Sequence, residues 1–198
     1  MKKSPATMNT NKKEALLHAA KELFGECGYV ETTFKKISER AGVALGLLTH
    51  HYGNKEKLFL ASGLDVLANF LEKLREATAG ATSGFDGVML FCRTYLDFSI
   101  DKDSNWLVLV RCSPYSDMKT KTDRDIMDSM FSQVHQELEQ IIVRGIKDGT
   151  ITNVDSKATA QVIISLMVGA NRTKVLTPYA CPSLYEDVLA FVSRAIRA

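Results

Sequence analysis

Apolar residues recur at spacings of three and four in segment after segment of this chain, and this repeat limits what the chain can fold into. In residues 10–27 the repeating set comprises Leu16, Ala20, Leu23, Phe24 and Cys27. Such spacing places side chains on one face of an α-helix. Because no segment alternates apolar and polar residues over the length of a strand, the sequence predicts an all-α fold.

The same repeat predicts about nine helices. Their expected bounds are 10–27, 34–40, 45–52, 55–79, 88–100, 106–112, 122–148, 156–176 and 184–197. The fourth helix would extend for about 37 Å and is long enough to connect two domains. Residues 1–9 lack the repeat, and we expect them to form a disordered arm.

The stretch from Thr32 to Lys57 predicts two short helices joined by a tight turn, which is a helix-turn-helix. The hydroxyl of Thr32 or Thr33 can cap the first helix by accepting a hydrogen bond from a backbone N–H. Gly42 can adopt the left-handed conformation that ends a helix and lets the next one leave at a steep angle.

The second of these helices has two faces. Leu48 and Tyr52 lie one turn apart and can hold it against the first helix. Gly46, Thr49 and His50 lie on another face, which can meet a partner.

Three segments of the sequence together resemble the DNA-binding domain of TetR/AcrR-type regulators. They are GY at 28–29, TTFKKISERAGV at 32–43 and HHYGNKEKL at 50–58. The resemblance covers roughly residues 10–60. It implies a three-helix helix-turn-helix domain at 10–57, followed by a helical effector-binding and dimerisation domain at 58–198. The expected function is that of a sequence-specific transcriptional repressor, released from its operator by a small molecule.

The residues expected to meet double-stranded DNA lie on and around the helix-turn-helix. They are Thr33, Lys36, Ala44, Leu45, Gly46, Leu47, Thr49, His50 and Lys55. Similar proteins use a lysine at the position of Lys55 to contact a DNA phosphate. Residues 1–57 hold ten Lys and Arg against six Glu, a net charge of +4, and the remainder of the chain carries −2. This asymmetry agrees in sign with a polyanionic partner.

Leu45 and Leu47 have two interpretations. In one, Leu45 joins Leu48 and Tyr52 in the domain core by the i, i+3, i+7 spacing, and only Leu47 is left over. In the other, both leucines face the major groove and contact thymine methyl groups.

The second helix of the helix-turn-helix departs from the resembling family. Ala44 stands where the family usually has a capping serine, and Leu45 and Leu47 stand where it often has polar residues. These departures motivate an alternative hypothesis, a helical small-molecule binding protein that has lost operator recognition.

The last two helices carry wide apolar faces with few charges, which predicts a homodimer. The residues expected at the interface are Ile163, Leu166, Met167, Ala170, Val188, Phe191 and Val192.

Methionines and aromatic residues between 88 and 131 suit an adaptable effector pocket. The candidates are Met89, Phe91, Tyr95, Phe98, Trp106, Arg111, Met127, Met130 and Phe131. Arg93, Arg111 or Tyr95 would orient a ligand if they point inward. An inward Arg111 favours an acid or a phenol, whereas no inward polar group favours a neutral or cationic hydrophobe.

Motifs of catalysis and cofactor binding are absent from the sequence, and we do not expect an enzyme or a cofactor. The four cysteines have no metal-ligand spacing, and the adjacent His50 and His51 would point about 100° apart on a helix. No metal site is therefore expected. The sequence contains no membrane-spanning run and no signal peptide, so we expect a cytoplasmic protein.

Overall fold

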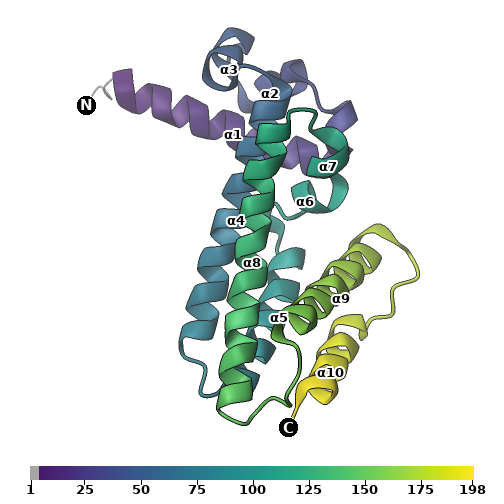
Figure 1. Cartoon of the computed structure of the whole chain (residues 1–198). Coiled ribbons are helices and arrows are strands. Elements are labelled where there is room, and N and C mark those ends of the chain that lie inside the picture. Colours follow the sequence, from purple (N-terminus) through teal and green to yellow (C-terminus); the bar gives the residue numbers. More distant parts are fainter. Residues whose placement is uncertain (1–4) are drawn as a thin grey trace. The chain divides into compact units, whose positions relative to one another are not determined.

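The computed structural model describes the backbone of residues 5–198 and the side chains of residues 11–198 other than Pro114. Within these ranges it contains ten α-helices, one 3-10 helix and a single isolated bridge between Ile151 and Arg197 (Figure 1). The all-α prediction is confirmed. None of the helices in the described part of the chain is long and apolar enough to cross a membrane.

Nine of the ten helices correspond to predicted ones. In chain order the elements are α1 (Pro5–Glu31), α2 (Phe34–Ala41), α3 (Leu45–Tyr52), α4 (Lys55–Ala79), α5 (Gly84–Ile100), η1 (Lys102–Ser104), α6 (Leu107–Arg111), α7 (Pro114–Asp117), α8 (Lys121–Lys147), α9 (Ser156–Leu176) and α10 (Leu184–Ile196). The additional helix is α7. It begins at a proline, which suits a first helical position because the N–H that proline lacks would have no partner there.

The predicted disordered arm is wrong for residues 5–9, because α1 begins at Pro5. Residues 1–4 lie outside the described residues. Once the apolar repeat of residues 16–27 has nucleated a helix, each residue added to its end costs little conformational free energy.

The chain divides into two compact units within α4. Unit 1 comprises residues up to Leu67 together with 105–129, and unit 2 comprises 68–104 together with 130–198. The predicted domain boundary lies ten residues earlier, after residue 57. Both α4 and α8 contribute residues to each unit, so two continuous helices connect the units covalently.

Unit 1 is built around aromatic contacts between α1 and α4. Phe24 and Phe59 are fully buried, with ring centroids 5.3 Å apart in an edge-on arrangement. Tyr29 stacks on Phe24 at 5.9 Å and meets Phe59 at 5.2 Å. These rings fix the end of α1 against the first turns of α4.

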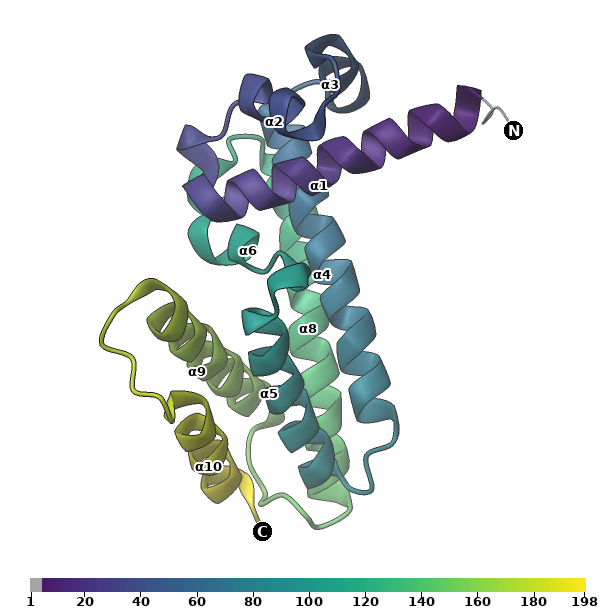
Figure 2. The ribbon, with the colours of Figure 1, turned by 180° about the vertical axis from the view of Figure 1, so that it is seen from behind.

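Unit 2 is built around α5, which packs on α9 and α10 (Figure 2). Phe70 of α4 contacts Tyr95 at 5.1 Å and Phe98 at 5.2 Å between ring centroids. Burial raises the pKa of Tyr95, so its phenol stays neutral at physiological pH.

The start of α5 lies directly on the end of α8. Ser83 caps α5 by accepting from the Asp86 N–H at 3.1 Å. The Gly84 N–H donates to the carboxylate of Asp148 at 2.7 Å. Hydrogen bonds from Thr150 and from Gly84 lower the pKa of Asp148. A Cβ added at Gly84 would lie 2.1 Å from both the Cα and the backbone N of Gly145, so only glycine fits.

We therefore expect Gly84→Ala to lower the free energy of unfolding by about 1–3 kcal/mol, because backbone atoms cannot yield as side chains can. Urea denaturation measures this loss. Gly80→Ala is the matched control, since a Cβ there would meet nothing within 4 Å. Equal stability of the two variants would contradict the close approach of α5 and α8.

Candidate nucleic-acid interface

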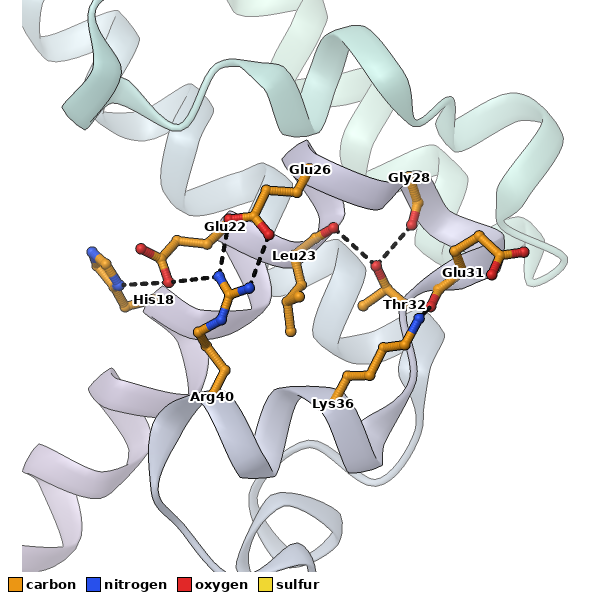
Figure 3. A network of polar contacts seen from close by, with 9 residues as sticks. All are labelled: His18, Glu22, Leu23, Glu26, Gly28, Glu31, Thr32, Lys36 and Arg40. Carbon is orange, nitrogen blue, oxygen red and sulfur yellow. Dashed lines mark hydrogen bonds and ion pairs between the residues drawn. The ribbon is translucent and has the colours of Figure 1, made fainter.

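A buried hydroxyl joins the end of α1 to the start of α2. Gly28 interrupts α1 with φ 78° and ψ 177°, and the chain then turns toward α2. Thr32 is fully buried, and its Oγ1 lies 3.0 Å from the carbonyl oxygen of Leu23 and 2.7 Å from that of Gly28 (Figure 3). This single donor serves carbonyls on both sides of the bend. The sequence offers Thr32 only as one of two capping candidates.

An ion-pair network fixes α2 to α1 from the other end (Figure 3). The guanidinium of Arg40 donates two hydrogen bonds of 2.9 Å to the carboxylate of Glu26, and it lies 3.6 Å from Glu22. The bond from Arg40 lowers the pKa of Glu26. Sequence reasoning missed this network. The one available signal is the i, i+4 pair of carboxylates on an exposed face of α1.

The predicted cap and turn of α2 are both present. Thr33 is the N-cap, and its hydroxyl accepts from the Lys36 N–H at 3.2 Å. Gly42 adopts the left-handed conformation with φ 62°, and its N–H donates to Glu39 O. The Val43 N–H donates to Ser38 O at 3.0 Å. These bonds satisfy the last carbonyls of α2 and set the direction in which α3 leaves.

Helix α3 is held by one fully buried side chain, that of Leu48. Tyr52, one turn later, donates its hydroxyl hydrogen to the carbonyl oxygen of Lys13 on α1 at 3.1 Å. Burial, followed by the charge of Asp65, raises the pKa of Tyr52 to about 12. The phenol therefore remains a donor at any physiological pH.

Four other residues of α3 are open to solvent. Gly46, Thr49 and His50 are exposed, and a Cβ at Gly46 would meet nothing within 4 Å. Ala44 is the N-cap and makes no side-chain hydrogen bond. The first turn of α3 thus presents backbone and small or apolar side chains to whatever approaches it.

Leu45 is 48% exposed and Leu47 is half-buried. The interpretation that Leu45 joins Leu48 and Tyr52 in the core is therefore wrong. Leu48 alone provides the buried anchor where α3 packs on α2 and α1. Leu45 is positioned on the surface, as the groove-facing interpretation requires, whereas Leu47 is partly covered.

The two predicted lysines both have partners within unit 1. Lys36 is exposed on α2, and its Nζ donates to Glu31 O at 2.8 Å. Lys55 is half-buried, donates to Tyr29 O at 3.0 Å and lies 4.3 Å from the centre of the Tyr29 ring. Asn54 caps α4 by accepting from the Lys57 N–H at 2.9 Å. The intramolecular contact of Lys55 was not anticipated from the sequence.

The predicted effector residues divide between the two units. Unit 2 contains Met89, Phe91, Tyr95, Phe98, Met130 and Phe131, of which Phe91, Tyr95 and Phe98 are buried. Unit 1 contains Trp106, Arg111 and Met127, of which Trp106 and Met127 are buried. Arg111 is exposed, as is Arg93, which lies 3.5 Å from Glu186. Neither arginine points into the core of its unit.

The predicted dimer residues are partly buried inside their own unit. Ile163, Met167, Ala170 and Val192 are at most 6% exposed, and Leu166 and Val188 are half-buried. Phe191 is 53% exposed. A groove of about 260 Å³ runs between α9 and α10, and its lining includes Val162, Leu166 and Phe191. Val162 is 58% exposed, so two large apolar side chains of this groove face solvent.

Comparison with known proteins shows that the helix-turn-helix matches a known protein family. The family model for bacterial regulatory proteins of the tetR family matches residues 16–62. Residues 16–62 therefore carry a helix-turn-helix of the TetR type. The match includes α2 and α3 entirely, together with residues 16–31 of α1 and residues 55–62 of α4.

Two curated relatives align with different shares of this chain. The HTH-type transcriptional repressor AcnR of Corynebacterium efficiens is 36% identical over 66 residues, which span 33% of this chain and 35% of that protein. The match thus covers about a third of this relative's length. The HTH-type transcriptional regulator YhgD of Bacillus subtilis is 24% identical over 161 residues, or 81% of this chain and 83% of that protein.

Similarity to solved structures extends beyond the helix-turn-helix to nearly the whole chain. A transcriptional regulator from Saccharomonospora viridis, solved in complex with choline, superposes with a TM-score of 0.83 at 14% identity. The superposition covers 94% of this chain and 97% of that one. At this identity the likeness establishes a shared fold.

The exposure of Leu45 predicts that the helix-turn-helix reads thymine methyl groups. Replacing thymidines of a selected operator by deoxyuridine removes only those methyls. At contacted positions we expect about fourfold weaker binding per methyl, the effect of about 0.8 kcal/mol for one buried carbon. Fluorescence anisotropy measures the affinities.

Leu45→Ala should abolish this sensitivity to deoxyuridine. Val30→Ala should retain it, because Val30 is 76% exposed and lies outside the helix-turn-helix. An equal deoxyuridine penalty in the wild type and in Leu45→Ala would rule out methyl reading by this leucine.

Proposed function

We propose that this TetR-family chain is a dimeric transcriptional repressor that binds operator DNA through α3 and is released by a small-molecule effector. The supporting observation is the division of α3 into two faces. Leu48 is fully buried, while Leu45, Gly46, Thr49 and His50 are exposed on a helix anchored by α1 and α2. A helix presented in this way suits insertion into a major groove.

The residues around α3 support DNA as the partner. Thr33 and Lys36 are exposed at the start of α2, and residues 1–57 carry a net charge of +4. Hydroxyl and ammonium groups are common phosphate ligands, and phosphate contacts set the register of a protein on DNA. AcnR, a relative by its helix-turn-helix, is named a transcriptional repressor.

Two polar contacts support coupling of DNA binding to the effector. The Lys57 Nζ lies 2.5 Å from the Asp123 carboxylate, and the Thr120 N–H donates to Glu56 at 2.6 Å. Both contacts join the first turns of α4 to the start of α8 inside unit 1. Because α4 and α8 continue into unit 2, an effector that biases these helices there would alter α4 where it packs on α1, and α1 in turn contacts α3. The Saccharomonospora viridis regulator, which shares the fold, was solved with choline.

The groove between α9 and α10 supports the dimer. Exposed Val162 and Phe191 line it, and a contiguous apolar surface of this kind commonly marks a protein interface. A second copy would cover the same residues in both protomers, as two-fold symmetry requires.

A second candidate function is a helical small-molecule binding protein without operator recognition. Ala44 favours it, because α3 lacks the side-chain cap whose loss typically costs about 1 kcal/mol. A measurement of operator binding distinguishes the two candidate functions, because only the repressor binds operator DNA.

Operator binding is tested with DNA from upstream of the chain's own coding sequence. Two recognition helices of a dimer need half-sites about 34–36 Å apart, or a multiple of that distance. We expect a near-palindromic site with this spacing to bind at least about 1,000-fold more tightly than scrambled DNA at the same salt concentration. Equal affinity for both DNAs would instead support the second candidate function.

Dimerisation is tested by Phe191→Glu. A carboxylate in the groove would be desolvated by a second protomer, so we expect monomers at micromolar concentration by light scattering. Tyr179→Glu is the control, since Tyr179 is 78% exposed and is not part of the groove lining. A Phe191→Glu protein that remains dimeric would place the interface elsewhere.

A further inference from the structure

His135 occupies an unusual position on α8. Phe131, Leu138 and Ile142 lie on the same stripe of the helix, at i−4, i+3 and i+7. Leu138 and Ile142 are fully buried, and Phe131 is half-buried. The stripe therefore faces the apolar interior of unit 2, where an imidazole needs partners for both of its nitrogens.

Only one nitrogen of His135 has a partner. Nδ1 lies 3.1 Å from the carbonyl oxygen of Phe131. Nε2 is buried and has no hydrogen-bond partner. A carbonyl oxygen can only accept, so the contact requires the proton to be on Nδ1. In the neutral ring, Nε2 then presents a lone pair, and a buried acceptor without a donor is destabilising.

No charged side chain among the described residues of unit 2 is fully buried, and Glu139, one turn after His135 on α8, is half-buried. Among the described side chains of unit 2, the buried polar ones are the neutral Ser99, Ser104 and Asn171, together with Tyr95, whose pKa is raised. Asn171 donates to the Tyr185 hydroxyl at 3.2 Å, and that hydroxyl lies 3.1 Å from Ser99 Oγ. An anionic ligand would find no buried counter-charge here.

We propose that Nε2 of His135 accepts a hydrogen bond from the effector, and that the effector is a neutral, mostly apolar molecule with a hydroxyl or N–H donor. The inference rests on the proposed effector response and names the chemistry of its ligand. Such a donor satisfies the lone pair, while the half-buried Phe131 offers an apolar side chain to the rest of the molecule. A carboxylate offers only lone pairs, which would repel that of Nε2.

The first test is the protonation of the imidazole. Nitrogen NMR of ¹⁵N-histidine-labelled protein distinguishes a ring nitrogen that carries a proton from one that carries a lone pair. At pH 7.5 we expect His135 to show a proton on Nδ1 and a lone pair on Nε2. A proton on Nε2 at that pH would overturn the proposal.

The second test uses three probes of matched size. Octan-1-ol has a hydroxyl donor, 1-methoxyheptane has the same heavy-atom count without a donor, and octanoate is anionic. Calorimetry on the full chain without DNA should show octan-1-ol binding at least about tenfold more tightly than the ether, with octanoate weakest. In His135→Phe, the alcohol and the ether should bind equally.

His18→Phe is the matched control, because His18 is exposed on α1 in unit 1, and it should keep the wild-type ratio. Equal binding of alcohol and ether by the wild type, tightest binding of octanoate, or no saturable binding of octan-1-ol would each overturn the proposal. Since no DNA is present, these outcomes are independent of operator binding, whose failure would appear only in the DNA assay.

Discussion

The helix-turn-helix depends on the hydroxyl of Thr32. It joins carbonyls of Leu23 and Gly28 across the bend at the end of α1, in a place without access to water. The next residue, Thr33, caps α2, so the same bend sets where α2 begins. Gly42 then sets the direction of α3. The position of α3 therefore depends on three successive features, which are the hydrogen bonds of Thr32, the Thr33 cap of α2 and the turn at Gly42.

The sequence predicts local features well and tertiary contacts poorly. Residues 156–176 form α9 with the predicted bounds, and Gly42 makes the predicted turn, because periodicity and glycine conformation are properties of neighbouring residues. The close approach of Gly84 to Gly145 involves residues far apart in the sequence, and no spacing rule reveals it. The residues of the candidate interface were predicted from the helix-turn-helix pattern, but the exposure of Leu45 required the structure.

Helix α3 contains no Lys, Arg, Asp or Glu. In the proposed complex its exposed side chains would contribute apolar contacts and neutral or histidine hydrogen bonds. Sequence preference would therefore arise largely from shape and methyl groups. The charged contacts that position the protein would come from α2 and the residues flanking the helix-turn-helix.

The contact between Lys55 and Tyr29 has a consequence for how such a protein would search a genome. Each phosphate neutralised by a protein cation steepens the logarithmic salt dependence of binding by about 0.9. While the Lys55 ammonium stays on the carbonyl and ring of Tyr29, it releases no counterion, and a two-fold complex has two fewer such contacts. Binding to unrelated DNA depends almost entirely on this electrostatic contribution. A protein in which Lys55 contacts Tyr29 and not a phosphate would bind more weakly to the many unrelated sites that compete with an operator.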